Sequence, residues 1–451
     1  MSIIKDNPRK LAWQTLNSIF IDGAYGNLAV SKALGNNHLS DQDRRFFTEL
    51  VYGTVKTQGT LDWLLSKCSY KELAKLEPRV RTALRLGAYQ IYYLSKVPAS
   101  AACNETVELV KSFGHEGMVK FVNGVLRNLV RQKATLTLPS RQENLGLYLA
   151  LNYYHPQWLI ERWRYRYGWE AAEQICEYDN KPPRITLRVN TKKITREALM
   201  AKLTAADYQV EPSPWSKDGL RGIQLGSVGK LMQEFGSYIY IQDESSMLAA
   251  DILAPQAGDL VVDVCSAPGG KTTHLAQKME GRGKVLAMDI YDHKLKLVAE
   301  NAKRLGLTNI ITKLQDAREL MPELVGKADR VLVDAPCSGL GVLGRRPEAR
   351  WRKVEKELSK FPPVQKQILA TAAQYVKPGG YLLYSTCTLE QDENTRVVAD
   401  FLSKNENFTQ VGFKHPQTGE TVAELQLLPQ VDDVDGFYLC LLQRRENRVN
   451  K

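Results

Sequence analysis

The sequence predicts a multidomain protein in which an all-α N-terminal bundle and a small α+β middle module precede a C-terminal α/β domain of Rossmann-like architecture. Three observations predict this order. Residues 1–135 form successive amphipathic stretches at helical spacing. Residues 148–240 combine one strand-like alternating stretch with helical ones, and residues 241–446 alternate apolar strand-like runs with helical stretches. That alternation is typical of a parallel sheet covered by helices.

The N-terminal bundle begins with the spaced apolar residues of "RKLAWQTLNSIF". A second helix is expected in "SDQDRRFFTELVYGTVK", with Ser40 as its N-cap. Residues 1–135 hold 19 Lys and Arg against 11 Asp and Glu, so most of the net charge of +11 lies here. Such an excess favours a polyanionic partner, of which nucleic acid is the commonest. A solvated basic surface explains the charge equally well.

The middle module follows an expected linker at 134–147, where Pro and Gly replace the helical periodicity. A helix is expected after Pro156, in "HPQWLIERWRYRYG". "PRITLRVNTKK" then alternates like a strand, and "TREALMAKL" has helical spacing.

The C-terminal domain contains five apolar runs that end in polar or small residues: "DLVVDVC", "KVLAMD", "NIITKLQD", "DRVLVDAPC" and "GYLLYSTC". Helical stretches such as "HKLKLVAENAKRLG" and "PVQKQILATAAQYV" separate them. Sheets of this kind bind ligands at the carboxyl ends of their strands. The residues with the most distinctive chemistry cluster at those ends.

The composition is that of an ordinary folded protein, with 43% hydrophobic and 25% charged residues. No apolar run approaches the roughly 18 residues of a membrane span, and the first residues lack the apolar core of a secretory signal. None of the seven cysteines lies in a CxxC pair, so zinc and thioredoxin-type sites are disfavoured and no metal is expected. We expect a cytoplasmic protein, with nothing that demands more than a monomer.

The loop "CSAPGGKTTHL" ends like a triphosphate-binding loop but does not match one. That motif is G-x-x-x-x-G-K-[ST], and its first glycine would stand at position 265, where this chain has Cys265. Two glycines between a strand and a helix let the backbone approach a ligand closely, and the helix N-terminus suits a carboxylate. The alternative is a tight turn and a helix cap without a ligand.

Two acidic residues stand at the ends of the next two strands. Asp289 lies 19 residues after Gly270, where a carboxylate accepts the hydroxyls of an unphosphorylated ribose. Asp316 ends the following strand and is placed to meet an adenine amino group. NAD and S-adenosylmethionine both have a free ribose and an anionic end, so this pattern leaves both cofactors open.

Two cysteines follow neighbouring strands, Cys337 in "DAPCSGLG" and Cys387 in "YSTCTLE". Parallel strands bring both thiols to the edge that carries the cofactor loop, and a thiolate is a strong nucleophile. Burial as small apolar residues explains Cys68, Cys103, Cys176 and Cys440 well, but it explains these two poorly. The spacing alone does not say which thiol attacks.

A nucleophilic thiol beside a methyl donor suggests methylation of cytosine at C5. A thiolate that adds at C6 makes C5 enamine-like, and a proton or hydrogen bond at N3, for which Asp334 is placed, assists the addition. A stacked base must first be moved into the pocket.

The segments "DVCSAPGGKT", "MDI", "DAPCSGLG" and "YSTCTLEQDEN" resemble the Nol1/Nop2/Sun family of RNA cytosine-5 methyltransferases. "LRVNTKK", "YIQDESSMLAA" and "DGFYLCLLQR" resemble its flanking segments, and "DRRFFTELVYGTVK" with "VNGVLRNLVR" is similar to the NusB-like RNA-binding domain. The resemblance covers nearly the whole chain. It implies an S-adenosylmethionine-dependent enzyme that forms 5-methylcytosine at one cytidine of 16S ribosomal RNA.

The resemblance also implies a role for each site residue. Cys387 is the nucleophile, and Cys337 helps to release the enzyme from its product. Asp289 holds the ribose, and Asp316 and Asp334 complete the cofactor side. The residues that wrap the methionine end are Cys265, Ser266, Ala267, Pro268, Gly269, Gly270 and Lys271. Ser266 stands where the family more often has Ala.

Basic and aromatic residues outside these motifs are candidates for RNA contact, by phosphate pairing and base stacking. They are Arg345, Arg346, Arg350, Trp351 and Arg352. A solvated helix start explains this run equally well. Arg188 and Asn190 are RNA candidates through the resemblance alone. A non-catalytic RNA adaptor would show damaged cofactor or thiol positions, and none of these positions is damaged. A nucleotidase is opposed by Cys265, which stands where its loop needs glycine. An NAD oxidoreductase fits Asp289 but leaves both thiols unexplained.

Overall fold

The chain divides into two compact units. The computed structural model describes residues 7–446. One unit comprises the residues up to 180 together with 343–355, and the other comprises 181–342 together with the residues from 356 onward. Within the described range, no helix is both long and apolar enough to cross a membrane.

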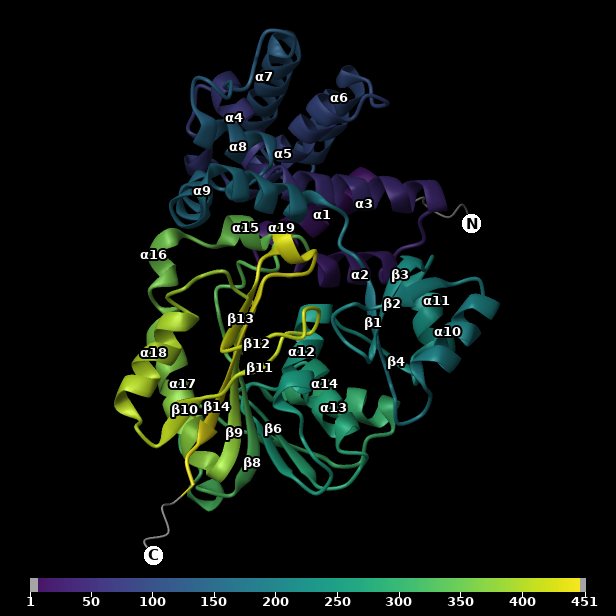
Figure 1. The fold of residues 1–451 in the computed structure, drawn as a ribbon. Helices are drawn as coiled ribbons and strands as arrows, with labels where there is room; N and C mark the ends of the chain where they lie inside the picture. The colour runs from purple at the N-terminus through teal and green to yellow at the C-terminus, as the bar shows by residue number, and fades with distance from the viewer. Residues whose placement is uncertain (1–6, 447–451) are drawn as a thin grey trace, which may run out of the picture. The chain divides into compact units, whose positions relative to one another are not determined.

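The first unit is helical, as predicted (Figure 1). Its helices are α1 (Pro8–Phe20), α2 (Gly26–Asn36), α3 (Asp41–Lys56), α4 (Gln58–Cys68), α5 (Pro78–Tyr93), α6 (Ala99–Lys111), α7 (Glu116–Gln132), α8 (Leu145–Asn152), α9 (Gln157–Asn180) and α15 (Ala349–Arg352). Ser40 caps α3 as expected, since its side chain accepts a hydrogen bond from the amide of Asp43. α5 is buried along most of its length and packs against α1, α3, α4, α6 and α7, so it forms the centre of the bundle.

Residues 145–180 belong to this helical unit, although the sequence places 148–180 in the middle module. α9 bends at Gly168, whose φ of 83° departs from the helical path. Trp163 and Cys176, on either side of the bend, are fully buried. The boundary between the two units along the chain therefore falls after residue 180.

The basic run that follows the loop of Cys337 packs inside the first unit. Arg350 is 1% exposed and donates hydrogen bonds to the carbonyl of Asp179, at 2.5 Å, and to the side chain of Asn180, at 2.9 Å. Arg352 donates to the carbonyl of Ile19 at 2.9 Å. The prediction that Arg350 contacts RNA is wrong, because its guanidinium group is buried against acceptors of the protein itself.

The remaining side chains of that run are placed differently. The ring of Trp351 lies so close to Gly59 that a methyl group added there would be 2.4 Å from it, so this ring is a packing element. Arg346 is exposed, with its guanidinium carbon 5.6 Å from the centre of the Tyr25 ring. Arg346 therefore stays a candidate for RNA contact.

The middle module is a four-stranded antiparallel sheet with two helices. Its strands run in the order β2-β3-β1-β4. They are β1 (Thr186–Val189), β2 (Gln209–Pro212), β3 (Gly219–Gln224) and β4 (Ile239–Ile241), and the helices are α10 (Arg196–Ala205) and α11 (Val228–Phe235). Leu187 and Val189 of β1 pack with Leu199 and Leu203 of α10 in the core of the module. The strand predicted in "PRITLRVNTKK" is thus confirmed.

The C-terminal domain contains a mixed eight-stranded sheet in the order β10-β14-β9-β8-β5-β6-β7, with β13 paired to β14. The strands are β5 (Leu260–Asp263), β6 (Lys284–Asp289), β7 (Ile310–Leu314), β8 (Ala328–Asp334), β9 (Val376–Thr386), β10 (Phe408–Gln410), β13 (Glu424–Leu427) and β14 (Phe437–Arg444). The five predicted strands are parallel. β14 runs antiparallel to β9, so the sheet is mixed where a parallel one was expected. A separate hairpin pairs β11 (Phe413–Lys414) with β12 (Thr421–Val422).

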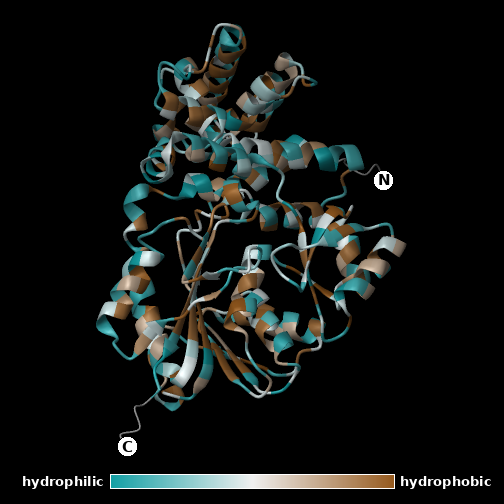
Figure 2. Cartoon of the chain, in the orientation of Figure 1, coloured by the Kyte–Doolittle hydropathy of each residue, from teal (hydrophilic) through white to brown (hydrophobic). Residues whose placement is uncertain are grey.

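Helices cover both faces of this sheet. They are α12 (Glu244–Leu253), α13 (Gly270–Lys278), α14 (Asp292–Leu305), α17 (Phe361–Tyr375) and α18 (Thr395–Lys404), with the short α16 (Glu355–Leu358) and α19 (Pro429–Asp432) outside the layers. Successive strand residues point to opposite faces. Val262 and Val331 pack with α17 and α18, whereas Val261 and Leu332 pack with α12, α13 and α14. Much of this sheet is accordingly brown in Figure 2.

The strand order reverses between β5 and β8. β6 and β7 lie on one side of β5, and β8 and β9 lie on the other. Ligands of such sheets bind beyond the carboxyl ends of the strands at this reversal. Asp263 and Asp334, the last residues of β5 and β8, mark that point.

Candidate active site

The predicted cofactor loop connects β5 to α13 at the reversal of strand order. Gly269 has a φ of +102°, and a Cβ built on it would lie 3.1 Å from the Cα of Val298, so this position requires glycine. No side chain caps the N-terminus of α13. Among the described residues, the buried hydroxyl of Ser266 has no hydrogen-bond partner. A close-approach glycine, an uncapped helix start and an unpaired hydroxyl fit the carboxylate end of an amino-acid cofactor.

A buried carboxyl group holds this loop from below. Asp263 is 1% exposed and accepts a hydrogen bond from the hydroxyl of Thr272 at 2.6 Å. Burial, together with the nearby charge of Asp334, raises the pKa of Asp263 to about 7, although the hydrogen bond from Thr272 acts in the opposite direction. The sequence analysis missed Asp263, although an acidic residue at the end of an apolar strand is the kind of signal that identified Asp289.

Asp289 and Asp316 end adjacent strands, as predicted. The Asp289 carboxylate accepts a hydrogen bond from the amide of Tyr291 at 3.0 Å, and the Asp289 carbonyl accepts one from the amide of Gln315 at 3.1 Å. Asp316 forms an ion pair with Arg318 at 2.5 Å. Hydrogen bonds from Arg318 lower the pKa of Asp316.

Cys265 lies among these acidic groups. Burial raises the pKa of its thiol well above the ordinary value, and the charges of four carboxylates add to the effect. Those carboxylates belong to Asp263, Asp334, Asp289 and Asp316. A thiol in this environment keeps its proton, so Cys265 is not a nucleophile.

The two predicted active-site thiols are neighbours. Cys337 follows β8 and Cys387 follows β9, and their sulfur atoms are 3.4 Å apart. Both side chains are partly exposed. Hydrogen bonding with Cys387 raises the pKa of Cys337 well above its ordinary value, and burial adds to this shift. The raised pKa favours the protonated form of Cys337, and the two sulfur atoms are within hydrogen-bond distance of each other.

Lys271 and Asp334 form an ion pair beside the thiols. The ammonium group of Lys271 lies 2.7 Å from a carboxylate oxygen of Asp334, and the hydroxyl of Ser385 donates to the other oxygen at 3.0 Å. Burial opposes the charge on Lys271, but Asp334 and Cys387 outweigh it and raise the pKa of the lysine. Asp334 therefore accepts hydrogen bonds here, and the proton of the pair resides on Lys271.

Glu393 joins the two thiol-bearing loops. Its carboxylate accepts hydrogen bonds from the amide of Ser338 at 2.8 Å and from the side chain of Gln365 at 2.9 Å. The hydroxyl groups of Ser338 and Thr388, each next to one of the thiols, are 2.7 Å apart. The sequence analysis quoted Glu393 within "YSTCTLEQDEN" without assigning it a role. The structure shows that it holds both loops in register.

The residues proposed for RNA through the resemblance lie inside the protein. Arg188 and Asn190 are each 1% exposed. Asn190 donates to the carbonyls of Ser237 at 3.0 Å and Leu305 at 2.8 Å. Their assignment as RNA contacts is wrong, because Arg188 in β1 and Asn190 just after it both donate to buried acceptors of the protein.

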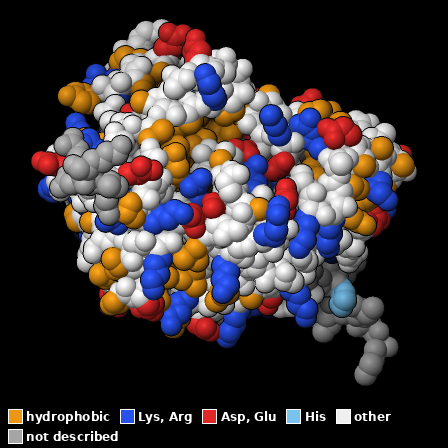
Figure 3. All heavy atoms as spheres, turned by 60° about the horizontal axis from the view of Figure 1, so that its bottom comes forward, with side chains coloured by type: hydrophobic (Ala, Val, Ile, Leu, Met, Phe, Trp, Pro, Cys, Tyr) orange, Lys and Arg blue, Asp and Glu red, His pale blue; other side chains and the backbone are white. Residues whose placement is uncertain are grey.

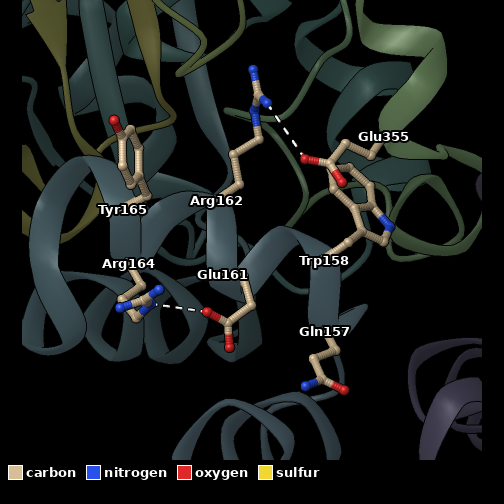
Figure 4. A pocket seen from close by; sticks show the side chains of 7 residues that line it. All are labelled: Gln157, Trp158, Glu161, Arg162, Arg164, Tyr165 and Glu355. Atoms are coloured by element: carbon tan, nitrogen blue, oxygen red, sulfur yellow. Dashed lines mark hydrogen bonds and ion pairs between the residues drawn. The ribbon is translucent and has the colours of Figure 1, made fainter.

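Two hollows are formed by residues of the first unit. One of about 360 Å³ is lined by Leu34, Arg44, Arg45, Thr48, Glu49 and Tyr52. The other, of about 600 Å³, is shown in Figure 4 and is lined by Gln157, Trp158, Glu161, Arg162, Arg164, Tyr165 and Glu355. Its charges are paired, Arg164 with Glu161 at 2.9 Å and Arg162 with Glu355 at 3.6 Å. Neither hollow contains a cysteine or a residue of the cofactor loop.

Within residues 7–446, metal-type ligands converge at Asp218, Asp251 and His274. The ammonium group of Lys278 lies 2.6 Å from Asp251 and 3.2 Å from Asp218, so it already neutralises the two carboxylates. His274 pairs with Asp218 at 2.9 Å. This cluster is an ion-pair network between the middle module and helices α12 and α13.

Comparison with known proteins supports the methyltransferase family that the sequence motifs indicate. The family model described as 16S rRNA methyltransferase RsmB/F matches residues 250–443, the NusB family matches 6–131, and an RsmF/B-like ferredoxin-like domain matches 155–227. The chain is 38% identical over 450 residues to the probable ribosomal RNA small subunit methyltransferase B of Bacillus subtilis, covering 98% of this chain and 99% of that one. A counterpart from Synechocystis is 37% identical, with coverage of 97% and 99%.

Solved structures agree with these relatives. The crystal structure of PH0851 has a TM-score of 0.84 and 28% identity, covering 98% of this chain and all of that one. NSun6 from Pyrococcus horikoshii with SFG, an analogue of S-adenosylmethionine, has a TM-score of 0.58 and 25% identity over 65% of this chain and 99% of that one. The resemblance noted from the motifs is confirmed, and it favours S-adenosylmethionine over NAD. The chain therefore belongs to the 16S rRNA methyltransferase RsmB/F family, a family of S-adenosylmethionine-dependent methyltransferases.

Proposed function

We propose that this protein methylates C5 of a cytidine in 16S ribosomal RNA through a covalent bond between Cys387 and C6 of the base. The observation that carries the proposal is the thiol pair. Two sulfur atoms lie 3.4 Å apart at the carboxyl ends of β8 and β9, beside the Lys271–Asp334 ion pair and the loop that begins α13. Few functions other than nucleophilic catalysis need two thiols there.

The protonation of the pair supports Cys387 as the nucleophile. Cys337 holds its proton, because hydrogen bonding with Cys387 and burial both raise its pKa. An S–H donor on one side and the Lys271 ammonium on the other stabilise negative charge on the sulfur of Cys387. The residues alone left the order of the thiols open, and this asymmetry supports the order that the family resemblance implies.

The cofactor residues are proposed from their placement. Cys265, Ser266, Ala267, Pro268, Gly269, Gly270 and Lys271 form the loop for the methionine end, and Asp289 and Asp316 lie at adjacent strand ends for the ribose and the adenine. S-adenosylmethionine, when bound, supplies an electrophilic methyl group on a sulfonium.

The chemistry follows from the arrangement of side chains. The Cys387 thiolate adds to C6, and the electron pair of the C5–C6 double bond becomes available at C5. The sequence predicts that Asp334 assists the addition at N3. We propose that it does so as part of its ion pair with Lys271, whose ammonium group can supply the hydrogen bond that neutralises charge developing at N3. After methyl transfer, loss of the C5 proton to water restores the double bond and expels the Cys387 thiolate. The S–H of Cys337 stabilises that leaving sulfur, which gives it a role in product release.

The substrate proposal rests on charge and on the relatives. Residues 1–135 carry most of the net positive charge, and the NusB family model covers residues 6–131. The face drawn in Figure 3 carries many Lys and Arg side chains interspersed with acidic and apolar ones. The printed names of the relatives specify the ribosomal RNA of the small subunit. We propose a monomer that acts in the cytoplasm, where reduced thiols persist.

The test is trapping on 16S rRNA that contains 5-fluorocytidine, in the presence of S-adenosylmethionine. Fluorine at C5 blocks the final proton loss, so the bond between sulfur and C6 persists. We expect a denaturation-resistant complex with the wild type, with Cys337→Ala and with the control Cys68→Ala, whose thiol is buried in the first unit. Cys387→Ala should form none.

Other outcomes lead to different conclusions. Loss of the adduct with Cys337→Ala alone would reverse the thiol roles and keep the chemistry. Absence of an adduct in all proteins, despite tight RNA binding, would reject the covalent mechanism. On unmodified RNA, Cys337→Ala should accumulate an adduct that the wild type resolves, and failure to do so would remove Cys337 from product release.

A further inference from the structure

The middle module contacts one face of α13, the helix that starts at the cofactor loop. The side chain of Gln277 donates to the carbonyl of Val189 at 2.9 Å and to the hydroxyl of Thr191 at 2.8 Å. His274 pairs with Asp218 at 2.9 Å. Residues at intervals of three and four share a helix face, so positions 270, 273, 274, 277 and 278 of α13 face the module.

Arg188 forms the end of this contact nearest the cofactor loop. Its guanidinium group donates to the carbonyl of Gly270, to the hydroxyl of Thr273 at 2.8 Å and to the side chain of Gln242 at 2.5 Å. It also lies 4.9 Å from the centre of the Tyr240 ring. One side chain of the middle module thus holds both ends of the first turn of α13.

This contact determines where the first turn can lie. Gly270 is the first residue of the helix, and Gly269 before it has the positive φ of the close-approach turn. A buried guanidinium is strongly destabilising when its acceptors are removed, so Arg188 and the turn hold each other in place. The residues next along the chain, Lys271 and Thr272, point the other way, to Asp334 and Asp263.

We propose that Arg188 is a positioning residue for S-adenosylmethionine, which orients the start of α13 from the middle module without touching RNA. The inference rests on the proposed assignment of this loop to the cofactor. It makes the middle module part of the cofactor site, although no residue of the module is in the cofactor motifs. It also explains why Arg188 is buried, which an RNA contact does not.

The chain offers a matched control in Arg304 of α14. Its guanidinium carbon lies 5.6 Å from the centre of the same Tyr240 ring, and it donates to the carbonyls of Gly236 and, at 2.8 Å, Ile239. Arg304 therefore joins the middle module to the C-terminal domain by similar bonds. Its side chain also donates to Asn301 at 3.0 Å, and Asn301 donates to the carbonyl of Pro268 at 3.1 Å. Arg304 thus reaches the cofactor loop only through a second side chain, whereas Arg188 bonds directly to the first turn of α13.

The experiment measures S-adenosylmethionine binding by calorimetry, 16S rRNA binding, and the KM for each substrate, on the full chain. For Arg188→Met we expect the Kd and the KM for S-adenosylmethionine to rise by about tenfold or more, with RNA affinity and kcat within about twofold of wild type. Arg188→Lys, which keeps the charge but not the fork of donors, should be intermediate. Arg304→Met should lower the melting temperature without changing cofactor affinity.

Two results would overturn the inference: a loss of RNA affinity in Arg188→Met with unchanged cofactor binding, or equal effects of Arg188→Met and Arg304→Met on cofactor binding. If Arg188→Met does not fold, Thr273→Val, which removes one acceptor, must raise the Kd for the cofactor. The variant Asp289→Ala distinguishes a failure of the positioning role of Arg188 from a failure of the proposed cofactor site. If Asp289→Ala binds the cofactor normally, the loop assignment fails; if only Arg188→Met binds normally, the positioning role alone fails.

Discussion

Replacement of Asp263 by Asn should remove a pH dependence of stability that is built into the cofactor loop. The Asp263 carboxyl is 1% exposed, and burial raises its pKa from 3.8 to about 7. Between pH 3.8 and about pH 7, the folded protein therefore keeps a proton on Asp263 that the unfolded chain has lost. The folded state is therefore stabilised at low pH by this group, and the stabilisation is lost as the pH rises through about 7.

The magnitude follows from the shift. A group that binds one extra proton in the folded state changes stability by about 1.4 kcal/mol per pH unit. Between pH 5 and pH 8, Asp263 should contribute a loss of about 2.5 kcal/mol, most of it below pH 7. Asn has nearly the same shape and its amide oxygen can still accept the hydrogen bond from Thr272, but it does not titrate.

The assay is urea unfolding of both proteins at several pH values between 5 and 8. Other groups titrate in both proteins, so the difference between the two free energies of unfolding isolates Asp263. Relative to the wild type, the free energy of unfolding of Asp263→Asn should rise by about 2.5 kcal/mol from pH 5 to pH 8. A difference that stays constant within about 0.5 kcal/mol would refute the assignment of a raised pKa to this carboxyl.

Three further outcomes are expected. Lys271→Gln removes the ammonium group beside Cys387 and should slow adduct formation on 5-fluorocytidine RNA by at least about tenfold, and an unchanged rate would exclude Lys271 from the chemistry. Arg350→Leu leaves buried carbonyl groups unpaired and should destabilise the protein by about 2–4 kcal/mol. The control Arg346→Ala, at an exposed position, should change the free energy of unfolding by no more than about 0.5 kcal/mol. Equal melting temperatures for the two variants would contradict this expectation. Gly269→Ala places a methyl group against the backbone of α14 at a positive φ and should weaken cofactor binding measured by calorimetry by about tenfold, so a wild-type affinity would mean that the loop tolerates the change.

The positions of the distinctive side chains at the ends of strands could be predicted from the order of residues alone. Apolar periodicity located the parallel strands of the C-terminal domain, and Asp289, Cys337 and Cys387 follow three of them. Because parallel strands end at one edge, their proximity was predictable without coordinates. The cofactor loop was predictable for the same reason, since a strand, two glycines and a helix are encoded by adjacent residues.

The surroundings of each of those side chains depend on long-range packing, which local patterns in the chain do not specify. Arg350 and Arg188 looked like RNA contacts, but they bind acceptors 171 and 82 residues away, respectively. The ion pair of Lys271 spans 63 residues, and the hydrogen bond between the two thiols spans 50. Burial and protonation depend on groups that are near in space and distant in sequence. Local pattern therefore specifies the elements and their ends, while long-range packing specifies which polar groups remain accessible and which carry the protons.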